Sequence, residues 1–253
     1  MNLALSFAFL LQLAFLLGIT VWLPVASTAQ VQLLANLFPA VSGRLLTLAQ
    51  GCFRLVIIGV ALRFYKDRLK QNLPAAACLS LPVLAAWLLL KSFLPSILSD
   101  PLVIAIVTVA SGAILLVVCK EAGNRATLDM RSFFAAGCTG ILALIPGVGI
   151  MTALVCGLTA AGQSEKNAYP MAVLGSVPVL AVQTLEQFGR ADFSQLLTPM
   201  VALSVLFGMV LSGLMAWVVL RGMTLWLKKH TFKPVAVVRM GFGIFLLLLY
   251  GIF

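Results

Sequence analysis

The stretch GILALIPGVGI, residues 140–150, joins two apolar segments through Pro146 and Gly147 without a charged residue. Those segments, at about 132–145 and 147–163, are shorter than the ~20 helical residues that cross a bilayer. Turns at a membrane surface usually carry charged side chains, and this turn carries none. We therefore predict a re-entrant helical hairpin, which enters the membrane and returns to the same side with its turn buried in protein.

The stretch LGITVWLPVASTAQ, residues 17–30, has the same pattern near the N-terminus. It joins apolar segments at about 1–19 and 24–38 through Pro24, again without a loop charge. A Gly-Ile pair precedes the proline at the same spacing in both stretches. The sequence thus predicts two hairpins of the same kind.

The composition indicates a membrane protein. Of 253 residues, 62% are hydrophobic and 9% charged, against ~45–50% and ~25% in soluble domains. A soluble enzyme and a disordered chain are excluded, and the apolar runs are too continuous for a membrane β-barrel. Six further segments have spanning character, at about 45–64, 75–98, 101–119, 168–187, 196–220 and 235–253. We predict an all-α integral membrane protein with six transmembrane helices plus two re-entrant helical hairpins.

The charges predict an orientation. Lys and Arg number 17, Asp and Glu 7, and the basic residues gather in loops near 63–70, 120–131 and 228–233. The loops at 95–100 and 188–195 are poor in them. The positive-inside rule places the three basic loops in the cytoplasm and both termini outside. The positive charge therefore indicates anionic membrane lipids, rather than nucleic acid, as its partner.

This topology predicts two halves of opposite orientation. The first hairpin opens to the outside and the second to the cytoplasm, and three crossings follow each. Residues 1–122 and 123–253 are thus expected to form an inverted repeat within one membrane domain. Inverted repeats with broken helices that meet near the bilayer midplane are typical of transporters.

Polar groups near the two turns are the candidate binding groups. They are Thr20, Ser27, Thr28 and Gln30 in the first hairpin and Gly147, Gly149 and Thr152 in the second. Hydroxyls and backbone N–H groups near helix N-termini bind anions. The alternative is that the hydroxyls only bond to helix carbonyls.

Arg54 lies inside a predicted span with no acidic residue nearby in sequence. A charge within the membrane is costly and marks a functional site by default. Arg54 either faces a cavity and binds a phosphate, or it pairs with carbonyls or snorkels. Arginines nearer segment ends are expected to snorkel to the interface: Arg44, Arg63, Arg221 and Arg239. Trp87 and Glu186 are expected at the interface or in packing.

No metal or cofactor is predicted. The five cysteines are scattered without CxxC spacing, and the single His230 lies in a basic loop. No acidic residue precedes Asp67, so the first hairpin has no carboxylate for acid–base chemistry. No nucleotide-binding or hydrolase motif occurs.

Both hairpin stretches resemble motifs of the undecaprenyl-diphosphatase (bacitracin-resistance, BacA/UppP-type) family. Residues 17–30 resemble E-G-x-T-E-F-L-P-V-S-S-T-G-H, and residues 146–152 resemble P-G-V-S-R-S-G. Residues 65–69, 99–103 and 227–232 are also similar, so the resemblance covers essentially the whole chain. It implies two inverted repeats and an isoprenoid lipid phosphate as substrate at the outer face of the bacterial inner (cytoplasmic) membrane. A homodimer stays open.

The departures from these motifs concern chemistry. Leu17 and Val21 stand at the positions of the two motif glutamates. Gln30 stands at the position of the histidine, and Ile150 at that of the arginine. Three motif serines are replaced, by Ala26, Gly149 and Met151, whereas Ser27 and Thr28 remain. Hydrolysis of a diphosphate needs proton transfer and cations that neutralise phosphate charge.

Three hypotheses follow. The first is a catalytically degenerate relative that binds or translocates a polyprenyl-phosphate-type lipid. The second is an active undecaprenyl-diphosphate phosphatase that uses Ser27, with Arg54 as a substitute and a divalent metal such as Mg or Ca. The third is an accessory subunit of a cell-envelope complex. A polar cavity with a lateral opening favours the first, acidic or arginine side chains at the turns the second, and a closely packed midplane the third.

Overall fold

The computed structural model describes residues 3–25, 27–37, 43–90, 100–120 and 128–251, and most of these residues lie in helices. The elements are α1 (Leu3–Thr20), α2 (Ser27–Leu37), α3 (Gly43–Phe64), α4 (Lys66–Leu90), α5 (Pro101–Lys120), α6 (Met130–Thr139), the 3-10 helix η3 (Gly140–Leu144), α7 (Ile150–Ala160), α8 (Glu165–Arg190), the 3-10 helix η4 (Phe193–Leu197), α9 (Pro199–Trp226) and α10 (Lys233–Gly251). The predicted all-α class is confirmed.

Within these described residues, six helices are long and apolar enough to cross a membrane: α3, α4, α5, α8, α9 and α10. This confirms the predicted number of spans. Each set of three follows a pair of shorter helices, so the order of elements is the same in both halves of the chain. The inverted relation of the halves stays a prediction.

One boundary differs from the sequence prediction. The basic stretch 66–70, expected in a loop, forms the first turn of α4. Lys and Arg are good helix formers, and Asp67 in the first turn favours the helix dipole. The irregularity comes later, at Asn72, whose φ of −122° and ψ of 24° depart from helical values two residues before Pro74.

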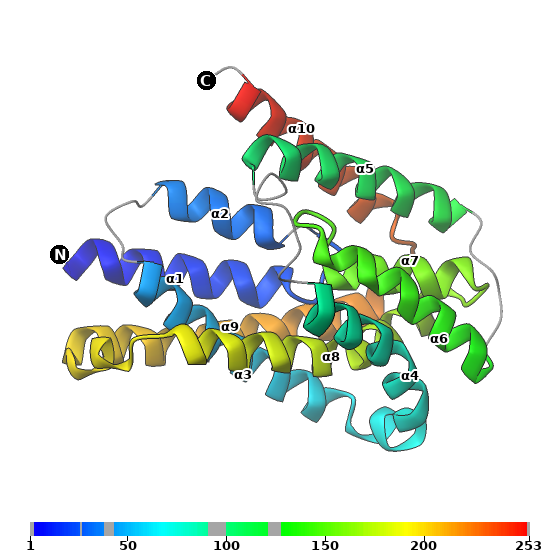
Figure 1. The fold of residues 1–253 in the computed structure, drawn as a ribbon, viewed down its shortest axis with the longest axis horizontal. Helices are drawn as coiled ribbons and strands as arrows, with labels where there is room; N and C mark the ends of the chain where they lie inside the picture. The colour runs from blue at the N-terminus through cyan, green and yellow to red at the C-terminus, as the bar shows by residue number, and fades with distance from the viewer. Residues whose placement is uncertain (1–2, 26, 38–42, 91–99, 121–127, 252–253) are drawn as a thin grey trace.

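The two predicted hairpins correspond to pairs of short helices that fold back on themselves, α1 with α2 and α6–η3 with α7 (Figure 1). In the second pair, Pro146 has no N–H to continue a helix. Gly147 and Gly149 follow with φ of 99° and 74°, in the left-handed region that only glycine adopts readily. The turn at 145–149 is thus encoded locally. That the pairs enter the membrane and return on one side stays a prediction.

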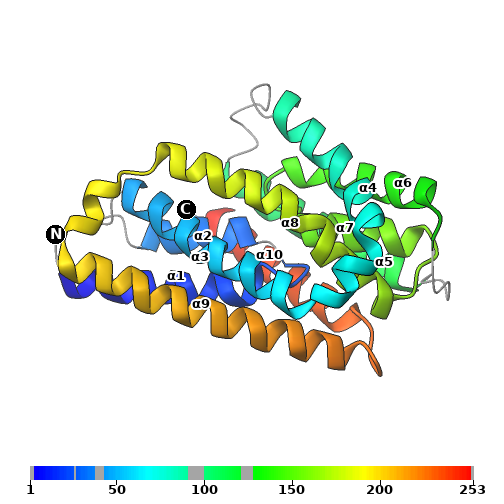
Figure 2. The same cartoon turned by 90° about the horizontal axis from the view of Figure 1, so that it is seen from below.

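The long helices pack in an interleaved way. α10 packs along α5, α1 along α9, and α3 contacts both α8 and α9, so the two halves share one interior (Figure 1). The connection between α8 and α9 lies at the same end of the molecule as the N-terminus, and the lysine-bearing junction between α9 and α10 lies at the opposite end (Figure 2).

Arg239 is buried in the protein interior. The sequence predicted that it would snorkel to the interface, but only 1% of its surface is exposed. That prediction was wrong because Arg239 is needed as a hydrogen-bond donor inside the protein. Its position on α10 faces the turns of both helix pairs rather than lipid headgroups.

The guanidinium of Arg239 donates to oxygens from three parts of the fold. Nη1 donates to the Pro24 carbonyl (2.9 Å) in the first turn and to the Thr152 hydroxyl on α7. Nη2 donates to the carbonyls of Gly147 and Val148 in the second turn and to the Ser111 hydroxyl on α5 (2.7 Å). Nε lies 3.4 Å from the Thr108 carbonyl. Every N–H of the side chain therefore has an acceptor, which offsets the cost of burying the charge.

Replacing Arg239 by methionine should destabilise the protein strongly. The substitution removes the donor of the Pro24 and Val148 carbonyls, and each buried acceptor that loses its donor costs about 1–3 kcal/mol. We expect a large drop of the melting temperature in mild detergent. Arg221→Met is the matched control, because Arg221 is exposed on α9 and lies over the Trp217 ring at 5.2 Å, and it should change stability by less than about 1 kcal/mol. Equal melting temperatures for the two variants would contradict this account.

Candidate functional site

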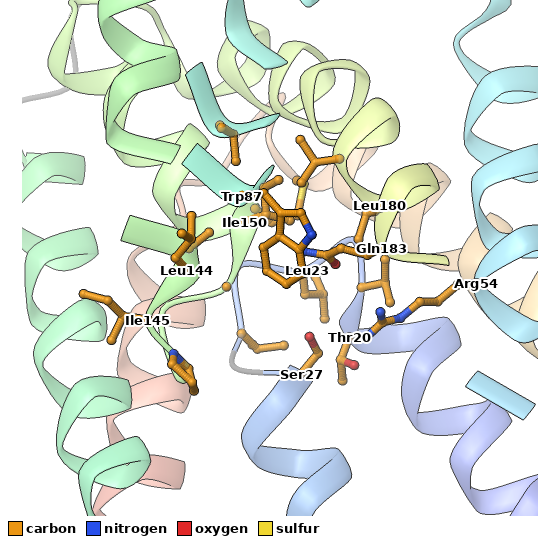
Figure 3. A pocket seen from close by; sticks show the side chains of 18 residues that line it. Thr20, Leu23, Ser27, Arg54, Trp87, Leu144, Ile145, Ile150, Leu180 and Gln183 are labelled. Atoms are coloured by element: carbon orange, nitrogen blue, oxygen red, sulfur yellow. The ribbon is translucent and has the colours of Figure 1, made fainter. Parts of the chain in front are cut away.

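A pocket of about 70 Å³ lies between the turns of the two helix pairs (Figure 3). By the same measure one water needs about 10–15 Å³, so the pocket has room for a few waters or one small polar group. Its walls come from the α1–α2 turn, α3, α4, η3, the α6–α7 turn, α7 and α8. The site therefore depends on elements from both halves of the chain.

Most of the lining is apolar. The polar side chains that line it are those of Thr20, Ser27, Arg54, Trp87 and Gln183. Among the described residues of the lining, Arg54 is the only ionisable side chain. A positive charge surrounded by apolar walls acts in a low local dielectric, which strengthens its attraction for an anion.

Arg54 reaches the pocket from α3. Its side chain points toward Thr20 and Ser27 of the first helix pair (Figure 3). The Nε atom is buried and has no hydrogen-bond partner in the part of the chain that the structure describes. Arg54 thus faces a cavity, and its binding of a phosphate there stays a prediction. A guanidinium at a cavity provides donors in the planar arrangement that matches phosphate.

The first helix pair supplies further unpaired polar atoms. Thr20 is buried at the end of α1, and its Oγ1 has no partner among the described residues. Ser27 begins α2 and lines the pocket. Gln30 lies outside the pocket, in a groove that includes Thr20, and its Oε1 is likewise buried without a partner. The side chain of Thr28 lies outside what the structure describes.

The second helix pair contributes backbone more than side chains. Gly149 lines the pocket, and a Cβ there would lie 3.3 Å from the Val25 carbonyl, so the two turns are nearly in contact. Gly147 and Thr152 face away, toward Arg239. The structure therefore gathers Thr20, Ser27, Arg54 and Gly149, and leaves the other predicted groups beside the pocket.

Sequence reasoning missed Gln183 and the place of Trp87. Both line the pocket, from α8 and α4. Trp87 Nε1 donates to Glu186 Oε2 at 3.3 Å, so the carboxylate lies behind the tryptophan instead of marking only an interface. Gln183 lies four residues from the end of the predicted span 168–187, where a polar side chain is expected near the membrane interface, so the sequence carried no distinct signal for it.

The lining limits the chemistry. Val21 and Ile150, which stand where the resembling motifs have a glutamate and the arginine, both line the pocket, and Leu17 is fully buried. The described lining residues offer hydroxyl and amide oxygens but no carboxylate, so the pocket does not fit a carboxylate-held Mg or Ca. Binding of an anion suits this set of groups better than proton transfer.

The comparisons with known proteins agree with the resemblance. The sequence profile of the family described as "Bacitracin resistance protein BacA" matches residues 10–245. The chain is 27% identical to "Undecaprenyl-diphosphatase 3" of Acinetobacter baylyi, over 93% of this chain and 94% of the relative. It is 24% identical to "Undecaprenyl-diphosphatase" of Caldanaerobacter subterraneus subsp. tengcongensis, over 92% of each chain. The chain therefore belongs to the BacA family of bacitracin resistance proteins, whose named relatives are undecaprenyl-diphosphatases.

Proposed function

We propose that this protein binds a polyprenyl-phosphate-type lipid by its phosphate, in the pocket between the two turns, without hydrolysing it. The observation that carries the proposal is the charge of the pocket: Arg54 is its only ionisable lining group among the described residues. The named relatives act on an isoprenoid lipid diphosphate, which makes such a lipid the natural anionic ligand here.

Arg54 supports binding for a physical reason. A guanidinium beside a cavity in a membrane protein is costly unless something compensates for its charge. A phosphate compensates for it directly and accepts two parallel hydrogen bonds from it. The Thr20 and Ser27 hydroxyls and the Gln183 amide line the same pocket, and they would complete the coordination of the remaining phosphate oxygens.

The absence of hydrolysis follows from what surrounds Ser27. A serine hydroxyl attacks phosphorus only when a neighbouring base removes its proton. The described lining holds no carboxylate, histidine or lysine, and Gln183 and Trp87 do not act as bases at neutral pH. Each stabilising group lost from an anionic transition state costs ~10²–10³ in rate.

Translocation of the lipid is the finer part of the proposal. Helix pairs that approach one site from opposite sides are the arrangement of alternating-access transporters. With both termini outside, the first pair would open to the outer face of the bacterial inner membrane and the second to the cytoplasm. Six long apolar helices and the family assignment support this multi-pass location.

An active phosphatase remains the second candidate. It is favoured by one observation: Ser27 and Arg54, a nucleophile and a cation, line the same pocket. An accessory subunit is favoured less, since the region between the turns is not closely packed but contains this pocket.

A phosphate-release assay separates binding from hydrolysis. We expect purified protein, given undecaprenyl diphosphate and either Mg or Ca, to release phosphate no faster than a protein-free control. The relative from Caldanaerobacter subterraneus serves as the positive control. Turnover comparable to that of the relative, and abolished by Ser27→Ala, would establish the second candidate instead.

Substitution of Arg54 tests the binding site. Arg54→Gln removes the charge while it keeps polar atoms, and we expect it to weaken binding of a short-chain polyprenyl phosphate in nanodiscs by about 10- to 150-fold, the equivalent of one charged hydrogen-bonding group. Arg63→Gln is the matched control, because Arg63 lies on the same helix, is exposed and does not line the pocket. Equal affinities for the two variants would refute the assignment of the pocket.

A further inference from the structure

Two apolar grooves adjoin the pocket. The first, of about 470 Å³, lies between α1, α2 and α10, and we call it the α1–α2 groove. Phe15, Ile19, Leu33 and Phe242 are among the residues that line it. Thr20 lines both this groove and the pocket, so the groove adjoins the proposed phosphate site at this residue.

The second groove, of about 350 Å³, lies between α5, η3, α6 and α7, and we call it the α6–α7 groove. Ile114, Leu142 and Ala153 are among its lining residues, and Ile145 belongs to both this groove and the pocket. It therefore meets the pocket at the turn of the second helix pair.

The α6–α7 groove offers little polarity to a ligand. Its hydroxyl-bearing residues are all engaged: Thr139 donates to the Ala136 and Ala153 carbonyls, at 2.7 and 2.8 Å. Ser111 and Thr152 accept hydrogen bonds from Arg239. The groove wall is therefore fixed from behind by the buried arginine, while the surface it presents is apolar.

The two grooves correspond to one another in the order of the chain. Each combines the helix pair of one half with the last long helix of the other half: α1 and α2 with α10, and α6 and α7 with α5. α5 and α10 pack side by side (Figure 1). The α1–α2 pair lies nearer the N-terminal end of the molecule and the α6–α7 pair nearer the opposite end (Figure 1).

We infer that the two grooves are alternative seats for the isoprenoid chain of one lipid, whose phosphate stays near Arg54. This inference rests on the proposed function. Both grooves adjoin the cationic pocket, at Thr20 and at Ile145, so an occupant needs an anionic group for Arg54 and a long apolar chain for one groove. With the chain in the α1–α2 groove the lipid extends toward one face of the protein, and with the chain in the α6–α7 groove toward the other. Exchange between the seats moves the chain across while the head group travels little.

Photolabelling tests the two seats. The probe is a polyprenyl phosphate with a diazirine at the far end of its chain, added to the full-length protein in phosphatidylethanolamine–phosphatidylglycerol vesicles. We expect labelled peptides from both grooves, and at least a tenfold loss of that labelling when excess unlabelled polyprenyl phosphate is present. Labelling of the exposed α9 face at Phe207 and Val210 reports ordinary lipid contact and should not respond to the competitor.

Bulky substitutions assign each seat. Ile19→Trp should remove competable labelling from the α1–α2 groove, and Ala110→Phe, at an exposed position that lines the α6–α7 groove, should remove it from that groove. Leu214→Trp, exposed on α9, is the control of similar bulk and should alter neither. Two results overturn the inference but leave the proposed function standing. One is labelling by the probe that responds to the competitor in only one groove. The other is the absence of such labelling from both grooves while Arg54-dependent binding persists. Loss of Arg54-dependent binding itself removes both.

Discussion

The hydrogen bonds of Arg239 hold together the parts of this protein that matter for its site. The side chain lies in the interior, where an isolated guanidinium would cost several kcal/mol, and backbone carbonyls from both turns compensate for it. They lie at turns where a proline interrupts the helical hydrogen-bond ladder. Arg239 thus donates hydrogen bonds to the turns of the broken helices, and the turn carbonyls compensate for its charge. The same bonds fix the turns relative to α5 and α10.

The pocket is a consequence of that arrangement. With the turns held by Arg239 on one side, Gly149 approaches Val25 closely, and the space beside them is lined by α3, α4 and α8. Arg54 enters this space from α3, whereas the arginine of the resembling motif would stand at position 150, where α7 begins after the second turn. The positive charge at the site is thus supplied by a different element, while the acidic groups have no replacement in the described lining. This combination supports our view of a binding protein on an enzyme's scaffold.

Much of the fold could be predicted because bilayer physics leaves few choices. Apolar runs of spanning length must be helical, since backbone groups have no other partners in lipid. The two uncharged Pro/Gly turns each join a pair of short segments, which distinguished those pairs from the long spans. The prediction of a loop at 66–70 was wrong because the charged residues there are typical of a loop but also form helices readily, and they form the first turn of α4. Arg54 was a candidate because charge within a span is rare, whereas Gln183 and Trp87 look like ordinary interfacial or packing residues until helices are placed around them.

The sequence by itself determined the class of the protein, its six spans, its two broken helix pairs and the positions at which it departs from the motifs it resembles. These are properties of single segments, and local hydropathy, proline and glycine are sufficient to define them. Only the tertiary structure decided that Arg54 faces a cavity. It also decided that Arg239, which is near a segment end in sequence, is buried against two turns that lie more than 90 residues before it in the chain. The reason is that the surroundings of a charged side chain are set by helices from elsewhere in the chain, and no local pattern encodes which acceptors they bring.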